Sequence, residues 1–123
     1  MPATVNVTSL DATQQGVIVE GTLTLSGNYP TGGDTVNFLS NAQIPSESSP
    51  RVPVQLTEQP ASGSTPSGFF FWLIQGTTAA NWLLFIATAS GQPVTQLGAG
   101  AYPAALTAAG FTLAFRAFFP YGV

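Results

Sequence analysis

The sequence has no cysteine, no histidine and no lysine, and charged residues make up only 6% of its 123 positions. A typical soluble domain carries about 25% charged residues. Without cysteine the chain has no disulfide and no thiolate ligand for zinc. Without histidine it lacks the commonest metal ligand and the side chain that titrates near neutral pH. We therefore expect no metal and no cofactor.

The few charges also limit the partners and the chemistry. The charged side chains are Asp11, Glu20, Asp34, Glu47, Arg51, Glu58 and Arg116, with a net charge of −3. Two arginines cannot neutralise a row of phosphates, so nucleic acid is not an expected partner. The sequence contains no nucleophile elbow, phosphate-binding loop or metal-ligand spacing. Arg116 is expected to pair with a carboxylate or carbonyls, and an enzyme is not expected.

The apolar runs are too short to cross a membrane. The most apolar stretch, residues 69–86, is interrupted by polar residues 75–78 and by Asn81. Each part is far shorter than the roughly 20 residues of a spanning helix, so we expect no membrane partner. Residues 1–4 (MPAT) lack the basic and apolar segments of a secretory signal. We therefore expect a protein made and folded in a cytoplasm, with residues 1–4 as a candidate extended arm.

The pattern of turn-forming and apolar residues is that of a β protein. Thirteen glycines and ten prolines are spread along the chain and leave few windows for a helix. Between them apolar residues alternate, most clearly over residues 16–26. Four apolar residues there share one face: Val17, Val19, Leu23 and Leu25. Further strands are expected at residues 5–7, 34–39, 51–58 and 111–119. Pro53 places its strand at a sheet edge or a bulge.

These strands predict one domain over residues 1–123. The fold class is all-β, an antiparallel β-sandwich or jelly roll with at most one short helical turn. That turn is expected within residues 101–110, starting at or after Pro103. Residues 41–50 and 58–68 are rich in turn formers and are expected to be surface loops.

Residues 69–74 (FFFWLI) and 82–86 (WLLFI) are apolar at every position rather than at alternate ones. The short polar segment between them predicts an antiparallel hairpin. A strand in a two-layer domain needs only one apolar face, so either other parts of this chain or another protein must cover the second. On the second interpretation the partner-binding residues are Phe70, Trp72, Ile74, Trp82, Leu83 and Phe85. The scarcity of charge favours it, because free monomers usually rely on charge for solubility.

Three segments carry a family resemblance: TGGDTVNF (31–38), GTTAANWLLFI (76–86) and GAGAYPAALTAAGFTLAFRAFFPYG (98–122). They resemble small virion proteins encoded beside the major capsid gene of tailed bacteriophages. In those proteins a GTTAAN-like turn is followed by a G-A-Y-P-A corner and a final aromatic strand. This chain has Trp82 and Leu83 where many of them carry a Gly-Lys pair, which makes its hairpin more apolar.

The resemblance implies a capsid decoration (cement) protein, a virion structural protein that binds across major capsid protein subunits and stabilises the shell. It also implies a place on the capsid surface and self-association, with a trimer favoured and a dimer as the alternative. Two other functions stay open. One is a tail or connector structural subunit of a phage. The other is a carbohydrate-binding β-sandwich module in which Trp72 or Trp82 stacks on sugar rings.

Overall fold

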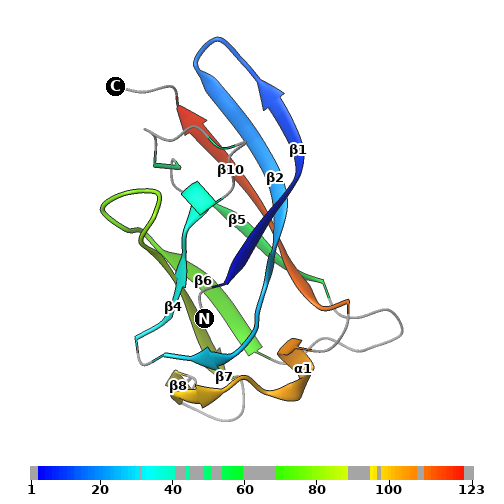
Figure 1. Cartoon of the computed structure of the whole chain (residues 1–123), viewed down its shortest axis with the longest axis vertical. Helices are drawn as coiled ribbons and strands as arrows, with labels where there is room; N and C mark the ends of the chain where they lie inside the picture. Colours follow the sequence, from blue (N-terminus) through cyan, green and yellow to red (C-terminus); the bar gives the residue numbers. More distant parts are fainter. Residues whose placement is uncertain are drawn as a thin grey trace.

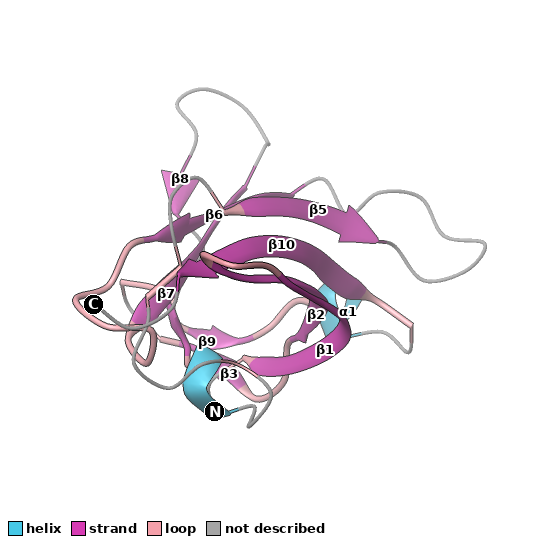
Figure 2. Cartoon of the chain, turned by 90° about the horizontal axis from the view of Figure 1, so that it is seen from above, coloured by secondary structure: helices cyan, strands magenta, loops and turns pink. Residues whose placement is uncertain are grey.

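In the computed structural model two antiparallel sheets pack together with one short helix, which confirms the predicted β-sandwich class (Figure 1). The structure describes residues 3–30, 32–40, 44, 49–50, 54–59, 69–88, 95–96, 98–107 and 110–120. Seen from above, the strands surround a common interior, with β6 and β7 at one side and β1 and β2 at the other (Figure 2).

The first sheet has the strand order β1-β2-β10-β5. Its strands are β1 (Thr4–Ala12), β2 (Gly16–Thr24), β10 (Thr112–Pro120) and β5 (Gln55–Gln59), and all pairs are antiparallel. The predicted alternation in β2 is confirmed, since Val17, Val19 and Leu23 are buried and Glu20 is exposed. The strand expected at 51–58 is an edge strand as predicted, although Pro53 itself lies outside the described residues.

The second sheet has the order β4-β7-β6 and contains the predicted hairpin. Its strands are β4 (Asp34–Val36), β7 (Trp82–Thr88) and β6 (Phe69–Ile74), with β8 (Thr95–Gln96) paired to the end of β7. A small two-stranded sheet joins β3 (Asn28–Tyr29) to β9 (Gly100–Ala101). The helix α1 (Ala104–Thr107) starts just after Pro103, as the sequence predicted.

The strand expected at 34–39 is shorter than predicted, because the chain leaves the sheet at Asn37. The Asn37 side-chain oxygen accepts a hydrogen bond from the backbone N–H of Leu39 at 3.0 Å and starts the 3-10 turn η1 (Phe38–Ser40). This turn directs Phe38 into the centre of the core. Its ring makes edge-on contacts, with ring centroids 5.5–5.9 Å apart, to Trp82, Phe115 and Phe119. Phe38 therefore joins the inner faces of both sheets.

Strand β1 is longer than the predicted segment 5–7 and contains a bulge. The register shifts between Val7 and Ser9, which leaves Thr8 as the extra residue, and its hydroxyl donates to the backbone oxygen of Glu20 at 3.1 Å. Gly21 lies opposite this bulge, where an added Cβ would be 2.1 Å from the backbone oxygen of Asn6. A glycine is thus required for β1 to approach β2 so closely.

The expectation of an extended arm at residues 1–4 is wrong for its described part. Ala3 is buried, forms a parallel bridge to Val36 and donates its N–H to the backbone oxygen of Thr35 at 3.1 Å. Thr4 already belongs to β1. These two residues link the first sheet to the second. Residues 1–2 lie outside the described residues, as does most of the two expected loops at 41–50 and 58–68.

Candidate protein-binding surface

The outer side of the β6–β7 hairpin is covered with apolar side chains. In an antiparallel pair, directly opposed residues point to the same side of the sheet. The register opposes Trp72 to Phe85 and Ile74 to Leu83, and Phe70 lies two residues from Trp72 on the same side. We call this set the outer apolar face: Phe70, Trp72, Ile74, Leu83 and Phe85. Five of the six predicted partner-binding residues are thus brought together.

The outer apolar face is open to solvent in the single chain. The exposed fractions are 48% for Phe70, 43% for Trp72 and 39% for Ile74, while Leu83 and Phe85 are half-buried. The ring of Trp72 stacks on that of Phe85 with centroids 4.5 Å apart and planes at 23°. Such stacking is a favourable contact, so the two rings form one continuous apolar surface across β6 and β7.

The sixth predicted residue, Trp82, does not belong to this face, and its assignment to partner binding is wrong. It is 1% exposed and packs edge-on against Phe38 in the core. Its indole N–H donates to the hydroxyl of Ser49 at 3.1 Å. The reason is register: Trp82 pairs with Val36 and shares the inner side of β7 with Leu84 and Ile86.

The loop between β6 and β7, residues 75–81, is fixed by its own hydrogen bonds. The side-chain oxygen of Asn81 accepts from the backbone N–H of Thr78 at 2.9 Å, and its amide donates to the hydroxyl of Thr77 at 2.7 Å. Ala79 is buried, and its backbone oxygen accepts from the N–H of Phe38 at 2.9 Å. This anchored loop places exposed polar side chains at one end of the outer apolar face.

The outer side of the first sheet is different, because it is mainly polar. Arg116 of β10 lies opposite Glu20 of β2 with 4.0 Å between the charged groups, and both side chains are more than half exposed. The expected pairing of Arg116 is present, but an exposed ion pair contributes little to stability. Threonines 22, 24 and 57, with Gln59, occupy much of the rest of this side.

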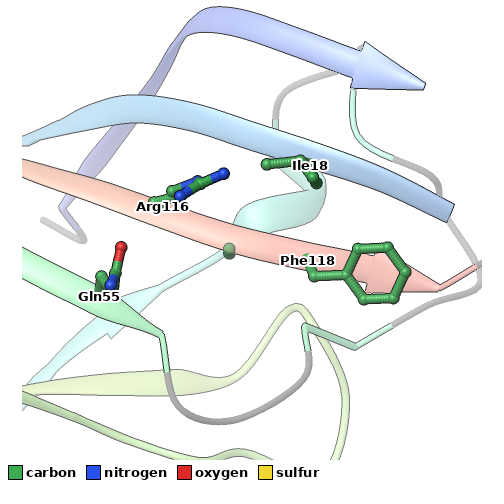
Figure 3. A pocket seen from close by; sticks show the side chains of 5 residues that line it. Ile18, Gln55, Arg116 and Phe118 are labelled. Atoms are coloured by element: carbon green, nitrogen blue, oxygen red, sulfur yellow. The ribbon is translucent and has the colours of Figure 1, made fainter. Parts of the chain in front are cut away.

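An open hollow of about 370 Å³ also lies on the first sheet (Figure 3). Its lining comes from β2, β10 and β5: Ile18, Arg116, Ala117, Phe118 and Gln55. Sequence reasoning assigned no site to Ile18, Gln55 or Phe118, although Ile18 and Phe118 are apolar residues at outward positions of β2 and β10 and so interrupt the alternation. The hollow is a shallow part of the surface rather than an enclosed pocket, and Glu20 partly neutralises its arginine.

A buried polar pair lies elsewhere in the fold. The Tyr102 hydroxyl donates a hydrogen bond to the carboxylate of Asp34, and both residues are buried. Burial raises the pKa of Asp34 above its usual value, although the Tyr102 hydrogen bond opposes the shift. Burial and the neighbouring carboxylate raise the pKa of Tyr102 well above that of an ordinary phenol. The pair ties β4 to the segment before α1.

The part of the chain that the structure describes contains neither a cluster of metal ligands nor a membrane-spanning helix. Within the ranges given above, no three histidine, cysteine, aspartate or glutamate side chains gather where they could hold a metal ion. Among the same residues, no helix is long and apolar enough to cross a membrane. Comparison with protein-family models, with curated proteins and with solved structures finds no match for this chain.

Proposed function

We propose that this protein is a structural, protein-binding component of a larger assembly rather than an enzyme. The observation that carries the proposal is the outer apolar face, which is exposed on the folded chain and contains the stacked rings of Trp72 and Phe85. Exposed apolar patches of this kind mark protein interaction sites in soluble proteins. The chain has no charged residue between Glu58 and Arg116, so binding through this hairpin depends on shape and apolar burial.

Within that class we propose a capsid decoration protein of a tailed bacteriophage, located on the capsid surface and bound to the major capsid protein. The support is the resemblance of residues 31–38, 76–86 and 98–122 to small virion proteins, together with the low charge. Many copies on a closed shell would stabilise it through multivalency even if each contact is modest. A tail or connector subunit needs the same surface and differs only in its partner.

The carbohydrate-binding alternative is less well supported by the outer apolar face. Trp72 offers an exposed ring for stacking, but sugar recognition also needs polar groups beside the ring to bind the hydroxyls. Apart from the indole N–H of Trp72, the five side chains of this face offer no hydrogen-bonding group. Trp82, the other candidate, is buried in the core.

Co-sedimentation tests the proposal. Purified protein is mixed with mature shells and with procapsids formed by the major capsid protein encoded beside this chain. We expect saturable binding to mature shells that persists in 0.5 M salt, because the chain carries only seven charged side chains that salt can screen. No binding to either shell, or the absence of a capsid gene beside this one, would reject the decoration role.

A further inference from the structure

We infer that the outer apolar face is the contact between two copies of this chain, packed face to face about a twofold axis. This inference rests on the proposed function, because it takes the exposed face as an assembly surface and names a second copy, rather than the major capsid protein, as its occupant. It differs from the trimer favoured on resemblance alone. Three features support it: where the charged side chains lie, the area of the outer apolar face, and, among the described residues, the presence of such a face on the second sheet but not on the first.

No charged side chain among the described residues belongs to the outer apolar face. Asp11, Glu20 and Arg116 are on the outer side of the first sheet, and Glu58 belongs to β5 of that sheet. Asp34 is on the second sheet but is buried. Two copies, each with net charge −3, can therefore approach through their second sheets without bringing these like charges together.

The area of the face matches what a small specific dimer needs. Exposed Phe70 and Trp72 each present about 100 Å² of apolar surface, and the five side chains together present on the order of 350 Å². Two identical faces bury about 700 Å² of apolar area. Since roughly 65% of a homodimer interface is apolar, the whole contact buries about 1,100 Å², close to the lower limit for a specific complex. A polar partner surface would supply only half of that apolar area.

Symmetry favours a closed pair over a ring. A twofold contact uses the same surface on both copies, whereas a ring needs two different complementary surfaces on each copy. Among the described residues, the outer side of the β6–β7 hairpin is apolar and that of the first sheet is mainly polar. The hydrogen-bonded loop 75–81 adds a preordered polar rim at one end of the face, which lowers the cost of ordering on association.

Analytical ultracentrifugation of the full chain from 1 to 200 µM tests the inference. We expect a concentration-dependent dimer of twice the 12.7 kDa monomer mass, with little change between low and high salt. Trp72→Ser is expected to raise the dimer dissociation constant roughly tenfold or more, as for a central aromatic side chain at an interface. Ile74→Ser is a second variant on the same face that leaves the Trp72–Phe85 stack intact and is expected to act in the same direction.

Leu10→Ser is the matched control. Leu10 is 40% exposed, like the residues of the face, but lies on β1 of the first sheet, so its replacement should leave the dissociation constant unchanged. A monomer at 200 µM, a trimer, or equal weakening by Leu10→Ser would each overturn the inference. If the protein is monomeric and Trp72→Ser abolishes shell binding, the face contacts the capsid, so the proposed function stands and the dimer does not.

Discussion

Replacing each tryptophan in turn separates the two sides of the β6–β7 hairpin. Trp82 is 1% exposed and Trp72 is 43% exposed. Burying a tryptophan removes about 250 Å² from water, worth about 6 kcal/mol at 25 cal/mol per Å². Alanine retains part of that burial, so Trp82→Ala should lower the free energy of unfolding by about 4 kcal/mol, in the usual range for a large core residue. The variant also loses the hydrogen bond to Ser49.

Trp72→Ala removes a side chain that is already partly in water. Its remaining contacts include the stack on Phe85, so the expected loss is about 1–2 kcal/mol. Urea denaturation followed by circular dichroism at 1 µM compares both variants with the parent, since dilution keeps association from adding to stability. In fluorescence, the tryptophan that remains in Trp72→Ala should be shielded from acrylamide, and the one in Trp82→Ala accessible to it. Equal stability losses, or a larger loss for Trp72→Ala, would refute the inner and outer assignment.

Three further changes test the rest of the fold. Gly21→Ala should lower the free energy of unfolding by about 2 kcal/mol or more in urea denaturation, because its Cβ would lie 2.1 Å from the Asn6 oxygen; an unchanged midpoint contradicts the close approach. Asn81→Ala should cost about 1–2 kcal/mol and increase proteolysis of the 75–81 loop, since Asn81 holds that loop through Thr77 and Thr78. Burial raises the pKa of Asp34 above 3.8, so the Asp34 carboxylate binds a proton more tightly in the folded chain than in the unfolded chain. The free energy of unfolding therefore falls as the pH rises from about 3.8 to the folded pKa of Asp34. Asp34→Asn keeps an acceptor for Tyr102 and should remove this loss; thermal unfolding from pH 3 to 7 with the same slope in both proteins would contradict it.

Alternation and turn residues were enough to predict most of the framework. β2, β10 and the β6–β7 hairpin each combine clear breaks with apolar residues at strand spacing, so their existence and approximate bounds follow from the sequence. The extension of β1 to Ala12 was missed because most of that strand is exposed and it pairs only with β2 along one edge. The 3-10 turn at Phe38 was missed because residues 34–39 have an apolar pattern typical of a strand. The hydrogen bond that the Asn37 side chain accepts from the Leu39 N–H, which starts the turn, gives no such pattern in the sequence.

The side assignment within the hairpin could not be predicted from its residues. When every position is apolar, hydrophobicity cannot tell the inner side of a strand from the outer side. Pairing decides it here: β4 opposes Val36 to Trp82 and so turns Trp82 inward, while Trp72 and Phe85 oppose each other on the outside. The Asp34–Tyr102 pair was hidden for a related reason, since its partners lie 68 positions apart and meet only in the folded chain.

The apolar character of the outer face is not required by the fold. The core depends on the inner sides of both sheets, where Phe38, Trp82 and Leu84 are fully buried. The outer side of the first sheet shows that the same architecture accepts threonine, glutamine and an ion pair at equivalent outward positions. Exposed aromatic side chains on an isolated sandwich make aggregation more favourable and contribute modestly to stability. Their concentration on the outer side of the β6–β7 hairpin is therefore best explained by a partner surface that covers them.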